Sequence, residues 1–454
     1  MSSGGGFDLL HAAHDKGIFL SWRPFVYCFI AANVAFLSIA PLQTLRNFEF
    51  LMLISPVWLP LVIGRFAILQ WITSNRLAFI ARQQYVLLEV RPPRDIRKTP
   101  LAMEAVFSTM HLSPGESTWW KRIVNGAVRP SWSFEIVSLG GRVHLYVRTR
   151  TTYRRSLESA FYAQYPGIEL VEATDYSLLT DPAHAPNQMW GCEYKFSAPD
   201  VWPIRTYAEF MNPTAPLAKP EEQVDPLAQI FEFLGSLSPK EQFWIQIMVR
   251  VSKDEKFAGK KTKSGGKYTI KDAKQDAVNA MREASKREVE KVDPSTGNRY
   301  KEWSYTPPTK GEQFAMEALE RKLSKPLFDV GIRALYTAPE EAYQGGGVIS
   351  HLIALWKPFS GEQNNSLGIT RWFANFDDWP WEDPKGIHHA HVGHGLVDAY
   401  RRRSYFNEPY KMEWMLMNSE ELATLFHIPA AGVTTPSLPR IQSATTNAPH
   451  NLPV

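Results

Sequence analysis

The chain has 454 residues, and its 50 Lys and Arg stand against 46 Asp and Glu, which leaves a formal net charge of +4. This near balance excludes a protein that binds nucleic acid through net charge alone. Its only cysteines, Cys28 and Cys192, exclude a disulfide framework and a cysteine-rich zinc site.

Residues 1–23 open with Ser and Gly, which predicts a mobile N-terminus. Residues 24–74 hold two apolar runs, Pro24 to Leu45 and Phe50 to Ile72, separated by a short polar break. A helix of roughly 20 apolar residues is long enough to cross a bilayer. We therefore expect a transmembrane helical hairpin over residues 24–74.

Three alternatives to this hairpin remain open, namely a cleaved signal peptide, a pair of buried core helices, and a re-entrant second segment interrupted by Pro56 and Pro60. In the re-entrant case Arg65 would snorkel to one interface. The predicted membrane anchor residues are Phe25, Phe29, Phe36, Leu51, Trp58, Leu61, Arg65 and Trp71.

The distribution of basic residues predicts the orientation of the hairpin. Arg76, Arg82 and Arg91 follow the second run, whereas the connecting loop carries only Arg46. Lys and Arg near membrane ends favour the cytoplasm. Both termini and the remaining modules are therefore expected on the cytoplasmic side of a plasma membrane, with lipid as a partner.

Residues 82–178 show the order β-α-β-β-α-β, which is the ferredoxin-like or split βαβ pattern. Two-residue alternation and turn signals mark the strands, and helical spacing marks the helices. The predicted strands are Tyr85 to Val90, Ser131 to Val137, Val143 to Arg148 and Ile168 to Glu172, and the predicted helices are Pro100 to Met110 and Thr152 to Tyr165.

Residues 188–428 repeat this pattern, with an insertion at 253–325 between the middle strands. The insertion predicts two helices, Ile270 to Val292 and Gly311 to Leu323. A last helix, Met417 to Phe426, follows a cap in which Asn418 and Glu421 reach toward each other's backbone. The expected fold class is α+β, a transmembrane hairpin followed by two ferredoxin-like modules. Residues 429–454 have the Pro, Ser and Thr content of a linker.

A glycine- and lysine-rich stretch contains Lys260, Lys261, Lys263 and Lys267. It lacks the spacing of a phosphate-binding loop, because Tyr268 stands where that loop needs Ser or Thr. The four lysines are candidates for electrostatic contact with lipid or DNA phosphates. The alternative is an ordinary solvated loop.

A histidine group includes His391 and His394, followed by Asp398. On a helix these three would share a face, which suits a metal ion. Gly393 and Gly395 argue against a regular helix, so the alternative is a surface loop. We expect no metal and no cofactor. No catalytic constellation stands out, so the chain is expected not to be an enzyme.

Three consecutive arginines, Arg401 to Arg403, lie within a predicted helix at Leu396 to Phe406. Consecutive helical positions point in different directions. At least one of these arginines is therefore a candidate for pairing with an acid at an interface. The alternative is a helix with all three arginines in solvent.

Four runs of sequence resemble a known family: Asp225 to Arg250, Lys310 to Ala338, Ala399 to Phe406, and Met417 to Ile441. With the N-terminal apolar block, they are similar to the membrane-anchored N-terminal region of ATPases related to type IV secretion and conjugative DNA-transfer motors in candidate-phylum bacteria. In that family a segment like Thr434 to Ile441 leads into a motor domain, which this sequence does not contain.

The resemblance implies a non-enzymatic platform on a bacterial plasma membrane that docks a motor ATPase encoded separately. It leaves homo-oligomerisation and DNA contact open. Two alternatives also stay open, a metal-dependent hydrolase that uses the His388 to His394 cluster, and a nucleic-acid-binding membrane protein that uses the basic 260–267 loop.

Overall fold

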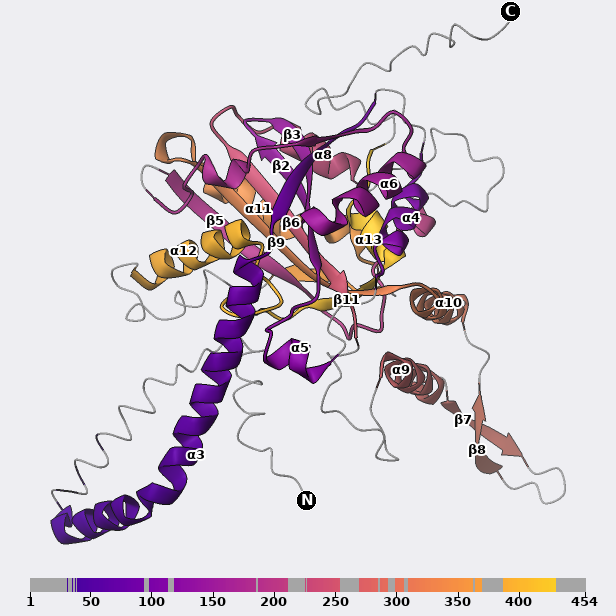
Figure 1. Ribbon diagram of the computed structural model, residues 1–454. Coiled ribbons are helices and arrows are strands. Elements are labelled where there is room, and N and C mark those ends of the chain that lie inside the picture. The colour runs from indigo at the N-terminus through magenta and orange to yellow at the C-terminus, as the bar shows by residue number, and fades with distance from the viewer. Residues whose placement is uncertain are drawn as a thin grey trace, which may run out of the picture. The chain divides into compact units, whose positions relative to one another are not determined.

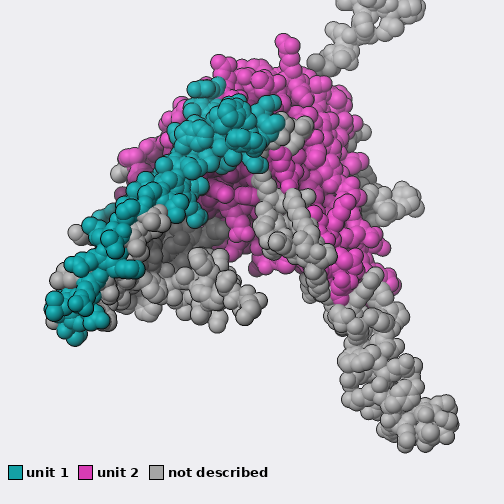
Figure 2. All heavy atoms as spheres, turned by 60° about the horizontal axis from the view of Figure 1, so that its bottom comes forward, with its two compact units in different colours: residues 1–82, 116–128, 373–390 teal, residues 83–115, 129–372, 391–454 magenta. Residues whose placement is uncertain are grey.

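The computed structural model describes residues 31, 35, 37, 39–93, 98–112, 118–184, 187–210, 225, 227–253, 269–284, 286–292, 299–305, 309–361, 364–369 and 387–429. The chain divides into two compact units, shown in different colours in Figure 2. Unit 1 comprises residues 1–82, 116–128 and 373–390, and unit 2 comprises residues 83–115, 129–372 and 391–454.

Unit 2 is built on one nine-stranded antiparallel sheet, which makes it a mixed α+β structure (Figure 1). Its strand order is β10-β5-β9-β6-β2-β3-β1-β4, and β11 pairs with β9. The strands are β1 (Tyr85–Arg91), β2 (Ser131–Leu139), β3 (Arg142–Arg150), β4 (Glu169–Glu172), β5 (Asn187–Phe196), β6 (Gln242–Val251), β9 (Leu327–Pro339), β10 (Leu367–Ile369) and β11 (Met415–Asn418).

The sheet contains the same topology twice. The strands of the first half lie in the spatial order β4-β1-β3-β2. Those of the second half lie in the order β10-β5-β9-β6, which is the same arrangement of fourth, first, third and second strand. The halves meet where β2 pairs with β6, from Ser131 opposite Arg250 to Leu139 opposite Gln242. The two stretches expected as separate modules therefore share one continuous sheet.

Helices cover one face of this sheet and bury its apolar side chains. Every second residue of β2 and β6, such as Phe134 and Ile247, is fully buried in this core. Helix α13 packs against α4, and α4 against α6 (Figure 1). The helices that contribute buried residues to this face include α4 (Leu101–Thr109), α6 (Arg154–Gln164), α8 (Ala228–Gly235), α11 (Gly345–Ala354) and α13 (Ser419–Leu425).

The opposite face is covered by α12 (Ile387–Arg402) and the segment that follows it. Val397 and Tyr400 of α12 pack on Trp244 and Leu335 of the sheet. Helix α12 runs through Gly393 and Gly395, so the expectation that these glycines break the helix is wrong. Two strand glycines allow α12 and the segment after it to pack closely on the sheet. A Cβ at Gly331 would lie 2.3 Å from the Tyr405 ring, and a Cβ at Gly191 would lie 2.4 Å from Leu396.

The insertion between β6 and β9 contains α9 (Ile270–Ala284), a two-stranded sheet of β7 (Lys286–Val292) and β8 (Arg299–Tyr305), and α10 (Lys310–Ser324). The single helix expected over Ile270 to Val292 is therefore wrong in its second part. The basic stretch with Lys260, Lys261, Lys263 and Lys267 lies outside the described residues.

Unit 1 contains the long helix α3 (Pro41–Ala81) and the short helix α5 (Trp119–Ile123). The predicted transmembrane hairpin is wrong. Its connecting loop, with Arg46 and Glu49, contains neither Gly nor Pro and continues the helix instead. Within the ranges that the structure describes, no helix combines the length and the apolar character that a membrane crossing requires.

The predicted anchor residues of that hairpin are only partly described. Phe25, Phe29 and Phe36 lie outside the described residues. Leu51 and Trp58 lie within α3, but their side chains are not described. The remaining three, Leu61, Arg65 and Trp71, are exposed on α3.

Candidate functional site

A row of polar side chains crosses the sheet beneath α12. Its members stand directly opposite one another in neighbouring strands, and each is less than 10% exposed. Cross-strand neighbours on one face are close enough to interact. We call this set the polar row; from β1 to β5 it comprises Glu89, Tyr146, Glu135, Gln246, Arg333 and Glu193.

Arg403, just beyond the end of α12, places a guanidinium on the centre of the polar row. Its Nε lies 2.9 Å from Oε1 of Glu135, and its Nη2 donates to Oδ1 of Asp175 at 3.0 Å. Arg403 adopts a left-handed backbone conformation, with φ of 51°. Since both charges of the Arg403–Glu135 pair are buried, removing Arg403 would leave Glu135 without its counter-charge.

The pairing sets the charge of the carboxylates. Burial alone would raise the pKa of Glu135, but the Arg403 charge and its hydrogen bonds outweigh that effect and hold the pKa below its usual range. The same balance lowers the pKa of Asp175, where burial opposes the hydrogen bond from Arg403. Both groups are therefore carboxylates at neutral pH.

Two further arginines on the same face form ion pairs within the sheet and also contact the covering segment. Arg333 lies 2.9 Å from Glu193 and donates to the carbonyl oxygen of Ser404 at 2.8 Å. Arg250 donates to Asp329 at 2.9 Å, and its guanidinium lies 4.4 Å from the ring centroid of Phe406. Residues 403–406 are thus tied to three strands by charge, hydrogen bonds and ring contacts.

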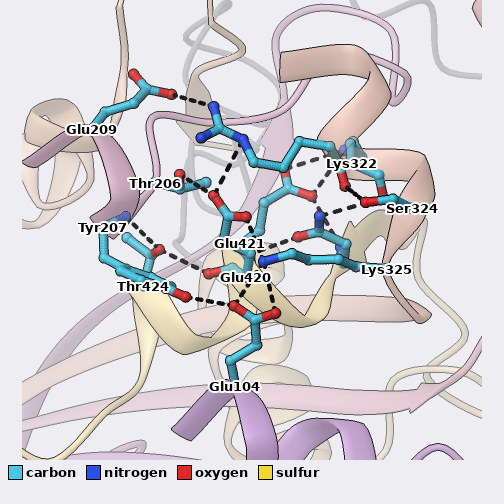
Figure 3. Close-up of polar contacts among 12 residues, drawn as sticks. Glu104, Thr206, Tyr207, Glu209, Lys322, Ser324, Lys325, Glu420, Glu421 and Thr424 are labelled. Atoms are coloured by element: carbon cyan, nitrogen blue, oxygen red, sulfur yellow. Dashed lines mark hydrogen bonds and ion pairs between the residues drawn. The ribbon is translucent and has the colours of Figure 1, made fainter. Parts of the chain in front are cut away.

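A second ionic cluster lies around α13 (Figure 3). Lys325 contacts Glu104 and Glu420 at 2.7 Å each, and the buried Lys322 contacts Glu421 at 3.1 Å. Burial raises the pKa of Glu421, against the opposing charge of Lys322. These contacts join α4, α13 and the segment at the end of α10.

Backbone and hydroxyl groups complete the α13 cluster. The Thr206 hydroxyl donates to Glu420 at 2.5 Å, and the Tyr207 hydroxyl donates to Glu104 at 2.6 Å. Asn418 and Glu421 form the reciprocal cap expected from the sequence, which is confirmed. The carboxylates of this cluster accept from Thr206, from Tyr207 of α7 (Tyr207–Phe210) and from the two lysines. These contacts hold α4, α7 and α13 in place against one another.

Beside Arg403 the chain displays two apolar side chains, Leu178 and Leu179, which are 69% and 74% exposed. They lie at the end of the 3-10 turn η2 (Tyr176–Leu178). Arg401 donates to the carbonyl oxygens of Ser177 and Thr180, each at 2.9 Å. We call Leu178 and Leu179, with the turn that carries them, the leucine turn. Its backbone is held from the side of α12 at both ends.

Asp175 holds the leucine turn from a second direction. Its Oδ1 accepts from the backbone N–H of Ser177 at 3.1 Å and from the Ser177 hydroxyl at 2.6 Å, and the same carboxylate binds Arg403. The buried ionic contacts and the exposed leucines therefore belong to one assembly. This arrangement can present an apolar surface in a fixed conformation.

The structure separates the predicted metal ligands. His394 stacks edge-on against His184, with ring centroids 4.7 Å apart, whereas Asp398 accepts from Tyr410 at 2.6 Å and from Arg402 at 2.8 Å. His391 is exposed on α12. Among the residues that are described, no three His, Cys, Asp or Glu side chains converge as a metal site would require.

The prediction that an arginine of the 401–403 run pairs with an acid is confirmed for Arg403, whose partner lies within this chain, and the interface part of that prediction stays a prediction. Sequence reasoning missed its partner Glu135. A signal was present, because Glu135 lies between Phe134 and Ile136 in a strand otherwise rich in buried side chains. A single charge at such a position indicates a buried ion pair.

Comparison with known families gives one match, a domain of unknown function (DUF8128), over residues 72–345. These residues include all but the last two strands of the nine-stranded sheet together with the insertion. No curated protein matches the chain. Because the match spans more than half of its length, the chain belongs to the DUF8128 family.

Proposed function

We propose that the chain is a non-enzymatic platform that docks a partner protein through the leucine turn. The observation that carries this proposal is the rigid display of Leu178 and Leu179 by Arg401 and Asp175. A backbone segment held in one conformation before association loses less entropy on binding. The two exposed leucines on this backbone offer apolar area that a partner protein can bury.

The buried charges favour a platform over an enzyme. Glu135 and Asp175 are engaged by Arg403, and Glu104 and Glu420 by Lys325. Groups held in such pairs stabilise the conformation of neighbouring segments and are not poised for proton transfer. The resemblance to the N-terminal region of DNA-transfer ATPases supplies the class of partner that we propose, a motor ATPase on a separate chain.

The test measures association between the purified full chain and the motor ATPase encoded beside its gene, by sedimentation velocity. We expect the Leu178→Ser/Leu179→Ser double variant to weaken the complex by roughly 10-fold or more, because burying a leucine side chain contributes about 1.5–3 kcal/mol. The matched control is Tyr162→Ala, which removes a side chain 48% exposed on α6.

Two outcomes contradict the proposal. One is a complex that forms equally well with the double variant and the parent chain. The other is hydrolysis of ATP by the chain alone. Since all three substituted side chains are exposed, the thermal midpoints of the variants should stay close to that of the parent.

A further inference from the structure

Unit 1 contains an aromatic and basic surface at the junction of α3 and α5. Helix α5 consists of Trp119, Trp120, Lys121, Arg122 and Ile123, and none of these residues is buried. Trp119 is 61% exposed and Trp120 is 55% exposed, with their ring centroids 5.6 Å apart. Two neighbouring exposed tryptophans followed by two exposed cations need a physical explanation, because large exposed aromatic side chains mark interaction sites.

The junction fixes α5 against the last part of α3. The Asn75 side chain donates to the carbonyl oxygen of Ile123 at 3.4 Å. Gly126 has φ of 62°, and a Cβ there would lie 2.2 Å from the carbonyl oxygen of Asn75. Only glycine permits this close approach in that conformation. The two helices of unit 1 therefore meet at a defined contact.

Helix α3 adds apolar side chains on its α5-facing side. Ile68 and Trp71 precede Asn75 by seven and four residues, so the three share one face of the helix. Ile68 is 58% exposed and Trp71 is 47% exposed. The combined surface thus has three tryptophans, an isoleucine and two cations. We call these six residues the junction patch: Ile68, Trp71, Trp119, Trp120, Lys121 and Arg122.

We propose that the junction patch binds the headgroup layer of an anionic lipid membrane as a peripheral contact. Tryptophan is enriched at the boundary between hydrocarbon and water, where its ring is apolar and its N–H polar. Interfacial helices bury their apolar side chains at this depth and direct Lys and Arg toward lipid phosphates. The proposal stands apart from the docking function, because it rests on a different unit.

Two other partners fit this chemistry less well. Protein interfaces are depleted in lysine, and the junction patch includes the exposed Lys121, which argues against a protein partner. Single-stranded nucleic acid would use the tryptophans for stacking and the cations for phosphates. Nucleic acid offers no apolar surface to the exposed Ile68, whereas the acyl chains just below the lipid headgroups do.

The experiment uses the full chain in flotation with vesicles of phosphatidylcholine alone and of phosphatidylcholine mixed with phosphatidylglycerol. We expect binding to the mixed vesicles to weaken as salt rises, because the lipid charge is screened. Lys121→Gln/Arg122→Gln should lower binding to mixed vesicles by roughly 30-fold, since each cation near an anionic surface contributes about a factor of five. Its binding to phosphatidylcholine vesicles should stay unchanged.

A second variant, Trp119→Ala/Trp120→Ala, should lower binding to both kinds of vesicle and reduce fluorescence quenching by brominated lipid. Tyr162→Ala is again the control and should bind like the parent. Equal binding by the parent and both double variants would overturn the proposal. A second result would also overturn it: a single-stranded oligonucleotide binds the parent and binds both double variants more weakly, while the parent does not bind vesicles.

Discussion

The two faces of the nine-stranded sheet bury comparable side chains by different means. On one face, alternate strand residues such as Phe134 and Ile247 are apolar and pack against helices. On the other, the polar row binds Arg403 through an ion pair and the Ser404 carbonyl through a hydrogen bond. Apolar packing tolerates many partners of suitable volume, whereas a buried charge accepts only its complement. The ionic face therefore specifies which segment covers it.

The largest expected effect comes from breaking the ionic face at Arg403. Arg403→Met leaves Glu135 buried without its counter-charge, and such a loss costs about 3–5 kcal/mol of unfolding free energy. Urea denaturation of the full chain measures this difference. The matched control is Arg402→Met, because Arg402 pairs with Asp398 in solvent and should cost less than about 1 kcal/mol. Similar costs for the two variants would contradict the role given to Arg403.

An intermediate loss of unfolding free energy is expected from overpacking the contact between the sheet and the segment after α12. Gly331→Ala places a Cβ 2.3 Å from the buried Tyr405 ring, and overpacking of this kind costs about 1–3 kcal/mol. Gly346→Ala in α11 is the control, because nothing lies within 4 Å of its added Cβ and alanine favours a helix. Urea denaturation should therefore show opposite signs for the two substitutions.

The smallest expected effect is the dependence on pH of the contribution that Arg403 makes to stability. The pKa values of Glu135 and Asp175 are lowered in the folded state, so the unfolded chain binds more protons as the pH falls past about 4. The pairing stabilises the fold fully above that pH, and its contribution disappears as the pH falls through the lowered pKa values. The deficit of Arg403→Met relative to the parent should therefore shrink between pH 7 and pH 3.

Phe134→Ala on the apolar face is the reference for this pH series. It removes a fully buried ring and should cost about 3–5 kcal/mol at both pH values, because no titrating group is lost. Other groups with shifted pKa values, such as Asp329 and Glu421, are present in every variant and cancel in the comparison. A deficit of Arg403→Met that stays constant with pH would argue against an ionic contact.

Local signals in the sequence predicted local structure. The Asn418–Glu421 cap depends on residues three apart, and the Gly140–Gly141 turn joins adjacent strands, so each is specified within a few positions. The arginine run at 401–403 indicated an acid partner because consecutive helical positions point in different directions, so that not all three arginines can face solvent alike. Its identity was not accessible, because Glu135 lies 268 residues away and meets Arg403 only after the sheet forms.

The failures have physical causes as well. A polar break at Arg46 and Glu49 suggested a loop, but these residues are compatible with helix and α3 continues through them. Charged residues from Lys286 to Val292 suggested helix and form a strand paired with β8. The leucine turn was not predicted either, since its rigidity comes from Arg401 on a distant helix.

The repeated topology of the sheet is asymmetric at the link between the middle strands of each half. Between β2 and β3 the chain reverses through Gly140 and Gly141, whereas between β6 and β9 it makes the long excursion through α9, β7, β8 and α10. Val251 stands opposite Phe328, so the chain departs from the sheet and returns at the same rung of the ladder. The near twofold topology is thus interrupted by an insertion in its second half only. A partner that bound this insertion would find no equivalent contact in the first half of the sheet, so the two halves would not be interchangeable to it.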